Sequence, residues 1–258
     1  MSIAASAECL VCAGANGKLY LFRIHPEFQR INNFCTITLC TREIWCIQIC
    51  KGLLRNGDLF VGTDTGELIN LDCRMPSLFR TVVDYFDASI YCMTHHVDLN
   101  LLALGMRYRD HAVVKILTTT NWSCVAHFDF REELRIDANV WAIAFNSEGT
   151  SILVGLDGSE GLLLVCPDAQ TQRIKGSRSR GSYTDITRFE DAWFASQSGG
   201  CIRSIGTRLR IDATYEISDG VADNDDPYNV PRYDVYCLAC TLWPPLRSAH
   251  EPQPSRFI

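Results

Sequence analysis

The cysteines of this sequence suggest metal chemistry first, because two Cys-x-x-Cys pairs have a spacing found in zinc sites. The pairs are Cys9/Cys12 and Cys237/Cys240. Residues three apart in a strand face opposite ways, and neither pair has a Gly or Pro inside it to make a turn. We therefore interpret both pairs as core thiols, with a four-cysteine zinc site as the alternative.

The thirteen cysteines as a set do not indicate a secreted disulfide scaffold. Their number is odd, the chain has 258 residues, and the N-terminal stretch lacks the basic region of a signal peptide. Most of them lie in apolar, strand-like runs, where a reduced cysteine behaves as a small hydrophobe. We expect buried thiols and a cytoplasmic or nuclear location.

The histidines and carboxylates do not assemble a catalytic set. His95 and His96 are adjacent, so in extended backbone their side chains point to opposite faces and cannot easily bind one metal ion. Asp64, Asp157 and Asp191 are scattered along the chain, and the sequence has no G-x-S-x-G, P-loop, G-x-G-x-x-G or H-E-x-x-H motif. We expect no enzyme activity, no cofactor and no metal.

Two charged stretches lie close together in the chain. The basic run RIKGSRSRGS (173–182) could contact phosphate or be phosphorylated at Ser177 or Ser179, and the alternative is a solvated loop. The acidic stretch 218–231 is expected to be an exposed loop that could pair with the basic run at little gain. The net charge of −6 and pI near 5.5 argue against nucleic acid and anionic membranes, and protein partners fit better.

A repeated order of short strands must position these residues. Each repeat opens on an aromatic residue between aliphatic and small ones, as in Ile44-Trp45-Cys46-Ile47. Counterparts begin at Ile90, Val140 and Val235, with a weaker copy at Tyr183-Thr184-Asp185-Ile186. The first two steps, 46 and 50 residues, indicate a repeat architecture. We interpret the aromatic as a packing residue between neighbouring repeats.

Each repeat continues with a hairpin of two apolar runs around a Gly-containing turn, and then with a more polar run. The hairpins lie at 9–24, 58–72, 101–117, 151–165 and 193–205, with a helical turn expected within 131–138. Four strands in about 45 residues make the blade of a β-propeller. The sequence predicts an all-β propeller of five to six four-stranded blades over 1–242, followed by a Pro-rich tail, 243–258.

The ends of the chain raise the question of ring closure. The chain is expected to begin at the second strand of a blade, and Asp234 to Leu242 has the character of a first strand. Two interpretations fit: this last strand completes the first blade and closes the ring, or the chain is a fragment of a larger ring.

The phrases IWCIQI and VWAIAF and the turn GTDTGELINLD resemble the WD-repeat family. Leu71-Asp72 stands where that family has Trp-Asp, and no Gly-His pair opens a repeat. The resemblance implies a protein-binding propeller. Asp72 and Arg74 resemble the Asp-x-Arg feature by which substrate receptors of one class of cullin ligases dock to their adaptor.

Tyr91-Cys92-Met93 and Tyr236-Cys237-Leu238 are also similar to the dactylin-type F-box/WD-repeat proteins, although this chain has no F-box. The two resemblances together imply the substrate-recognition subunit of a ubiquitin ligase, with a cullin-ligase adaptor and a substrate as partners. The alternative is a general scaffold unrelated to ubiquitin. Four further residues expected on turns are candidates for partner contact: Arg107, Tyr108, Arg109 and His111.

Overall fold

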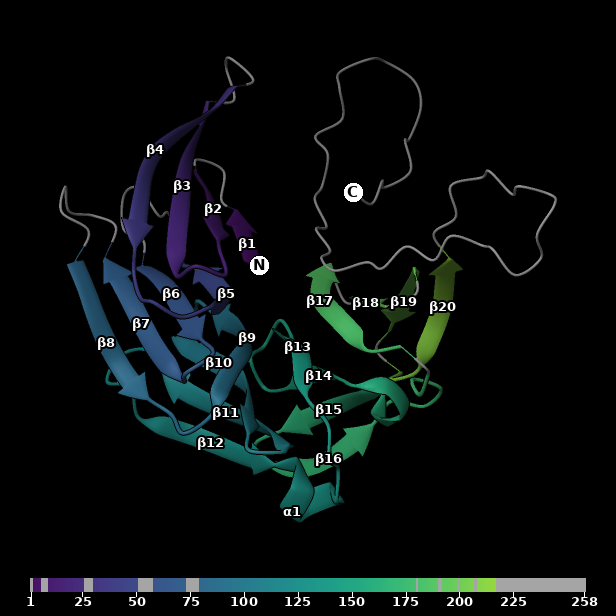
Figure 1. The fold of residues 1–258 in the computed structure, drawn as a ribbon. Helices are drawn as coiled ribbons and strands as arrows, with labels where there is room; N and C mark the ends of the chain where they lie inside the picture. Colours follow the sequence, from purple (N-terminus) through teal and green to yellow (C-terminus); the bar gives the residue numbers. More distant parts are fainter. Residues whose placement is uncertain are drawn as a thin grey trace, which may run out of the picture. The chain divides into compact units, whose positions relative to one another are not determined.

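Five antiparallel sheets of four strands each make this chain an all-β, five-bladed β-propeller (Figure 1). The computed structural model describes residues 2–5, 9–25, 30–50, 58–72, 79–179, 181–189, 192–198, 200–206 and 208–216. Within each sheet the strands pair in chain order, so one continuous stretch of sequence builds one blade. The predicted fold class and a count within the predicted five to six blades are confirmed.

The chain divides into two compact units, residues 1–145 and 146–258. Blades 1 to 3 and the first strand of blade 4 belong to the first unit. Its strands are β1 (Ser2–Ala5), β2 (Cys9–Ala13), β3 (Lys18–His25), β4 (Arg30–Thr38), β5 (Ile44–Ile49), β6 (Asp58–Thr63), β7 (Glu67–Asp72), β8 (Phe79–Tyr85), β9 (Ser89–His96), β10 (Leu101–Tyr108), β11 (His111–Thr118), β12 (Cys124–Asp129) and β13 (Val140–Phe145).

The second unit holds the rest of blade 4 and blade 5. Its strands are β14 (Ile152–Leu156), β15 (Leu162–Cys166), β16 (Ala169–Arg173), β17 (Tyr183–Phe189), β18 (Ala192–Gln197), β19 (Cys201–Ile205) and β20 (Ile211–Glu216), with the 3₁₀ helix η2 (Gly158–Glu160) between β14 and β15.

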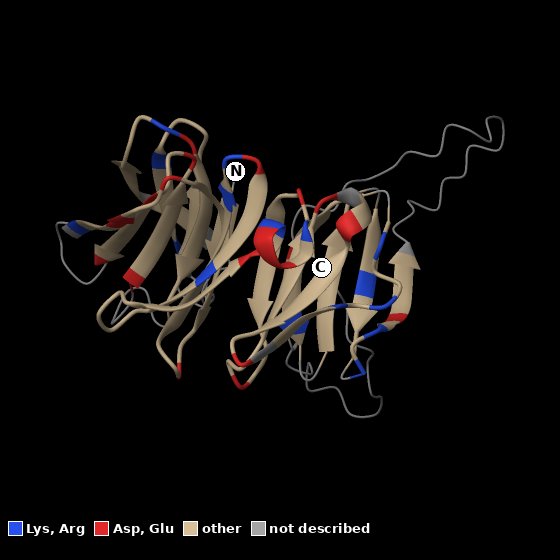
Figure 2. Ribbon diagram, turned by 90° about the horizontal axis from the view of Figure 1, so that it is seen from below, with Lys and Arg blue, Asp and Glu red and all other residues tan. Residues whose placement is uncertain are grey.

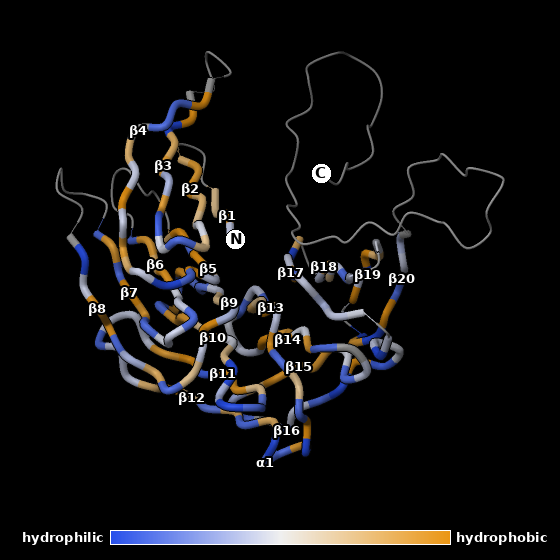
Figure 3. The backbone as a smooth tube through the Cα atoms, in the orientation of Figure 1, coloured by the Kyte–Doolittle hydropathy of each residue, from blue (hydrophilic) through white to orange (hydrophobic). Residues whose placement is uncertain are grey.

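The predicted hairpins are the second and third strands of the five blades, and the polar third runs are the outer strands such as β8 and β12. The middle strands are apolar on both faces because stacked blades cover them from both sides, and β14 is buried throughout. In Figure 3 the hydrophobic positions lie mainly along the strands, and many hydrophilic positions lie at the turns.

The helical turn predicted within 131–138 is α1 (Phe130–Leu134). The carboxylate of Asp129 accepts hydrogen bonds from the backbone N–H groups of Arg131 and Glu132, which satisfies two donors at the start of the helix. Arg135 ends the helix in the left-handed conformation, with φ of 56°.

The start of the first blade differs from the prediction. Residues Ser2–Ala5 form β1, which pairs with β2 over its whole length, so blade 1 has four strands of its own. The expectation that the chain begins at a second strand is therefore wrong. The first strand was missed because SIAA lacks the aromatic that marks the other first strands. Asp234 to Leu242, the strand expected to complete this blade, lies outside the described residues.

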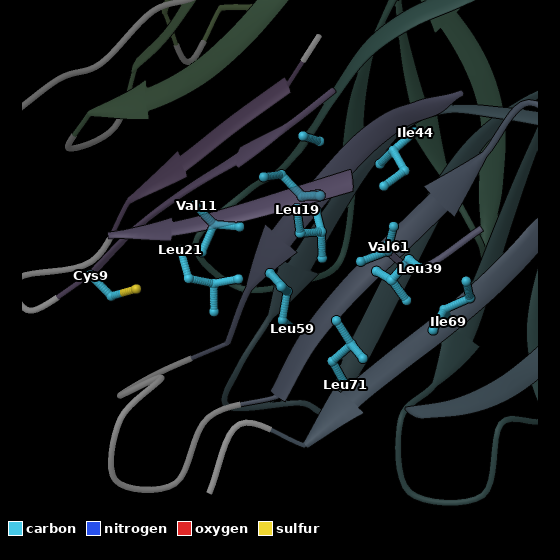
Figure 4. Close-up of a cluster of buried hydrophobic side chains, with 12 residues drawn as sticks. Cys9, Val11, Leu19, Leu21, Leu39, Ile44, Leu59, Val61, Ile69 and Leu71 are labelled. Carbon is cyan, nitrogen blue, oxygen red and sulfur yellow. The ribbon is translucent and has the colours of Figure 1, made fainter. Parts of the chain in front are cut away.

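Neighbouring blades of the first unit share an apolar core. One cluster joins β2 and β3 of blade 1 to β5, β6 and β7 of blade 2 (Figure 4). It contains Val11, Leu21, Leu59 and Leu71, each no more than 1% exposed. Burying this many aliphatic side chains stabilises the stack by roughly 1.5–3 kcal/mol per side chain before entropy is counted.

The small residue after each aromatic has a packing role between blades. The Cys46 thiol in β5 lies over Gly62 of β6 and donates to the backbone oxygen of Ile90, 3.5 Å away in blade 3. A Cβ on Gly62 would lie 2.7 Å from both the Cys46 sulfur and Ile90 Cγ2, so only glycine fits between them. The same arrangement recurs one blade later at Cys92, Gly105 and Val140.

Candidate protein-interaction site

Three aromatic side chains from three successive blades meet in the first unit. The Trp45 and Tyr91 rings are 4.7 Å apart, those of Tyr91 and Trp141 5.0 Å, and those of Trp45 and Trp141 6.4 Å. They stand on the first strands β5, β9 and β13 at the inner edges of their blades, where β9 contacts both β5 and β13 (Figure 1). All three side chains are only half-buried. We call them the aromatic cluster.

β-Bulges direct two of these side chains out of the strand register. Ile44 pairs with Thr63 and Cys46 pairs with Gly62, so Trp45 between them has no partner on β6. Tyr91 occupies the equivalent unpaired position on β9. Bulges are frequent beside functional sites because the extra residue changes the direction of its side chain. In the second unit the bulge of β17 carries Thr184 instead of an aromatic.

Polar groups lie next to the aromatic cluster. The Asp64 backbone N–H donates to the carbonyl of Glu43, two residues before Trp45, and the Ser89 hydroxyl donates to the Asp64 carbonyl at 2.6 Å. Asp64 Oδ1 and Trp45 Nε1 are buried with no hydrogen-bond partner among the described contacts. Both atoms are out of reach of a partner, so it is the half-exposed faces of the rings that suit an apolar partner group.

The four residues expected on turns do not share one setting. Arg107 and Tyr108 end β10, and only Arg109 lies in the turn that follows. The Arg107 Nε donates to the Arg109 carbonyl at 3.1 Å, and the Arg109 guanidinium stacks 5.2 Å from the Tyr108 ring centre. Arg109 is exposed, and its φ of 54° places it in the left-handed region.

His111 is a buried strand residue rather than a turn residue, with 7% exposure in β11. Its Nδ1 lies 3.2 Å from Asp110 Oδ1 and its Nε2 3.1 Å from Asp129 Oδ2. The hydrogen bond from His111 lowers the pKa of Asp110, and Arg131 also contributes, with its Nη1 2.7 Å from Asp110 Oδ1. These contacts tie the β10–β11 turn to α1.

Asp72 is the last residue of β7, at the end of the third strand of blade 2, and is half-buried. Arg74, the second half of the Asp-x-Arg feature, lies outside the described residues. The expected position of Asp72 in its blade is therefore confirmed, and the docking role of the pair stays a prediction.

The His pair faces two different blades. The His95 ring packs edge-to-face against Phe60 of blade 2, with 5.7 Å between the ring centres. The His96 ring packs in the same way against Phe145 of β13, also at 5.7 Å. Burial lowers the pKa of His95, and the neighbouring His96 lowers it further. In the described part of the chain no three His, Cys, Asp or Glu side chains gather in a way that could hold a metal ion.

The cysteine pairs also separate. Cys9 is buried in β2 while Cys12 is half-buried on the opposite face, and Cys237 and Cys240 lie outside the described residues. Burial raises the pKa of the Cys9 and Cys12 thiols, and raises that of Cys50 to about 12. Thiols of this kind are poor zinc ligands, because zinc binds the thiolate.

Ser177 is inaccessible to a kinase in this fold. It is 0% exposed, accepts a hydrogen bond from the Leu162 N–H at 2.9 Å, and donates to the Ile174 carbonyl at 2.8 Å. Ser179 is half-buried and bonded to Gly181 and Gln197. Contacts from blades 4 and 5 therefore hold Ser177 and Ser179 in place, while Lys175 and Arg178 of the basic run are exposed, as expected of a solvated loop.

Helix α1 has five residues, and no other helix within the described ranges has the length and apolar character that crossing a membrane requires. Asp64 directly follows β6 and Asp157 directly follows β14, in separate units, and Asp191 lies outside the described residues.

The fold is that of a five-bladed β-propeller of four-stranded antiparallel sheets. The fold is similar to that of Sqt1 from Saccharomyces cerevisiae, a WD40 β-propeller protein, with a TM-score of 0.66 and 14% sequence identity over 95% of this chain. The alignment covers 64% of the Sqt1 chain, so this chain spans less than two thirds of its length.

At 14% identity the similarity to Sqt1 shows the fold alone. In total, 1123 chains of solved structures match this fold. No family model and no curated protein matches the sequence. The comparisons add no support to the resemblance to dactylin-type F-box proteins.

Sequence reasoning assigned the aromatics at 45, 91 and 141 to packing between blades, which is correct as far as their mutual contact goes. It missed that they are half exposed and gathered on one surface. The sequence did carry one signal of this exposure, the small residue after Trp45 and after Tyr91. That small residue, and not the ring, faces the glycine of the next strand.

Proposed function

We propose that this protein is a non-catalytic interaction propeller that acts as a scaffold or adaptor in a multiprotein complex. The observation that carries the proposal is the aromatic cluster: three rings from three blades, in mutual contact and half exposed. Tryptophan and tyrosine dominate the energetic centres of protein interfaces because they bury a large area at a low entropic cost.

The chemistry beside the rings supports a protein partner more than a small substrate. The three rings together offer a half-exposed apolar contact that a large partner side chain can cover. We propose that a partner segment places an apolar side chain on the rings.

The test compares tagged full-length protein with a Trp45→Ala/Tyr91→Ala variant in affinity purification followed by quantitative mass spectrometry. We expect the main partners of the natural protein to fall at least tenfold, the effect of losing about 1.4 kcal/mol or more of binding energy. Tyr85→Ala is the matched control, since Tyr85 is a 66% exposed aromatic on the outer strand β8. Circular dichroism checks that each variant is folded. Unchanged recovery of every partner by the double variant would contradict the proposal.

The narrower hypothesis, a ubiquitin-ligase substrate receptor, depends on Asp72 and Arg74. The place of Asp72 at the end of a third strand supports it. Recovery of a cullin and its adaptor by the natural protein, and their loss in Arg74→Glu, is the expected result. A stable complex without either protein would leave the general scaffold as the function.

A further inference from the structure

Lysine and arginine are concentrated in one part of this acidic chain. Residues 173–210 contain eight Lys and Arg against three Asp and Glu, whereas the whole chain has a net charge of −6. A local excess of positive charge in a negative protein creates a field of opposite sign at that part of its surface. All of these residues belong to the second unit.

The fold brings the cations of two separate segments together. Lys175 and Arg210 form a parallel β-bridge, which joins the link between blades 4 and 5 to the turn between β19 and β20. Lys175, Arg178, Arg208 and Arg210 are all exposed. We call these four residues the basic patch. The Lys and Arg positions can be followed in blue in Figure 2.

The backbone under the basic patch is held in place by polar contacts from blade 5. The Tyr183 hydroxyl, in a side chain that is 0% exposed, donates to the Ser177 carbonyl at 2.7 Å. Arg203 Nη1 donates to the carbonyls of Gly176 at 3.1 Å and Ser177 at 3.3 Å, and to the Tyr183 hydroxyl at 2.9 Å. A segment fixed in this way presents its cations at a lower entropic cost than a free loop does.

Among the described residues of the second unit, little of the positive charge of the basic patch is neutralised. Arg210 Nε lies 3.4 Å from Asp212 Oδ1, but both side chains are exposed, and such a pair contributes at most about 1 kcal/mol. Among the described ion pairs none involves Lys175, Arg178 or Arg208. Arginine binds carboxylates through two parallel N–H donors, so these cations suit a ligand with several carboxylates.

We propose that the basic patch is a second docking surface, which binds an acidic segment, rich in Asp and Glu, of a protein partner. A nucleic acid fits less well, because its long line of phosphates would extend beyond four cations onto a protein whose net charge is −6. The proposal does not depend on the aromatic cluster, which stands on first strands of the first unit.

The test measures fluorescence anisotropy of a labelled peptide of about ten glutamates against the full-length protein at about 50 mM salt, where screening is weak. We expect saturable binding that weakens as salt rises, and no binding of the matching glutamine peptide. Arg208→Glu should weaken binding about tenfold, the loss of one charge-assisted contact.

Arg42→Glu is the matched control, because Arg42 is an exposed arginine of the first unit and its reversal changes the net charge by the same amount. We expect less than a twofold effect from it. Equal losses in both variants, or no binding by the natural protein, would overturn the proposal. Tighter binding of an oligothymidine that competes with the peptide would also overturn it, in favour of nucleic acid.

Discussion

One position of the repeat is filled in two different ways in the two units. In the first strand, one residue before the aromatic or its counterpart, blade 3 has Ile90, blade 4 has Val140 and blade 5 has Tyr183. All three side chains are 0% exposed. The aliphatic residues meet a glycine and a cysteine of the preceding blade, whereas the tyrosine hydroxyl is bonded to Ser177 and Arg203.

Side chains that are equally buried at this position therefore place different requirements on their neighbours. An aliphatic side chain needs only a close steric fit, so the blade contact in the first unit depends on glycine. A buried tyrosine also needs a hydrogen-bond partner for its hydroxyl, and here the partner is the backbone of the basic run. Blade 5 thereby fixes a charged segment that would otherwise be a loop.

The largest expected effect is at the aliphatic contact. In Gly105→Ala the new Cβ would lie 2.4 Å from the Cys92 sulfur and 2.6 Å from Val140 Cγ1, so the blades must move apart. We expect a loss of about 2–3 kcal/mol in the free energy of unfolding, measured by urea denaturation.

Gly14→Ala is the control for that substitution, because its Cβ would meet the flexible end of Asn16 rather than the neighbouring blade. We expect a change within about 0.5 kcal/mol. Equal losses at Gly14 and Gly105 would show that the contact between blades is not the cause.

The polar contact should be weaker than the aliphatic one. Tyr183→Phe keeps the ring and removes the hydroxyl, which leaves the Ser177 carbonyl and the Arg203 guanidinium short of one partner. We expect a loss of about 1–2 kcal/mol and faster hydrogen exchange of the Leu162 amide, whose acceptor is Ser177. Tyr85→Phe on the exposed surface should change neither quantity.

Tyr183 also makes the stability of the second unit depend on pH. Burial raises the pKa of Tyr183 to about 12, although Arg203 opposes the shift, whereas an unfolded tyrosine titrates near 10. The stability linked to the neutral hydroxyl is fully present below pH 10 and is lost as pH rises toward 12. Absorbance near 295 nm should show one tyrosine ionising late in the natural protein, and its absence in Tyr183→Phe.

A smaller effect is expected at acid pH in the first unit. Burial lowers the pKa of His95 below 6.5, so the unfolded chain binds its proton first and stability falls as pH drops below 6.5. His95→Leu should flatten this part of the curve of unfolding free energy against pH. His127→Leu, at an exposed position of β12, should leave the curve as it is.

The smallest expected change is in thiol labelling. Burial raises the pKa of the Cys46 thiol, so we expect no alkylation by iodoacetamide in the folded protein, whereas the exposed Cys124 reacts readily. Peptide mass spectrometry measures both. Rapid labelling of Cys46 would show that the contact between blades 2 and 3 opens easily.

Much of the fold could be predicted because strand and turn signals are local. The hairpins at 58–72 and 101–117 each carry two apolar runs around a turn, and β6, β7, β10 and β11 lie there. Ser2–Ala5 escaped prediction because a four-residue strand without an aromatic becomes a strand only by pairing with β2.

The candidate sites were less predictable. Trp45 could be recognised as a repeat residue, but its exposure depends on a bulge and on rings supplied by two other blades. His111 was expected on a turn but is a buried strand residue. The local sequence could not show this, because its Nε2 is hydrogen-bonded to Asp129, eighteen residues away.

The sequence by itself determined the four-strand repeat, the β class and the concentration of basic residues, because alternation, turn residues and charge are properties of neighbours in the chain. Only the tertiary structure decided which side chains became surfaces. Stacking of blades buries the residue beside each aromatic, and the Tyr183 hydroxyl anchors the basic run through Ser177. Both outcomes depend on contacts between residues that are distant in sequence, and no local pattern encodes such contacts.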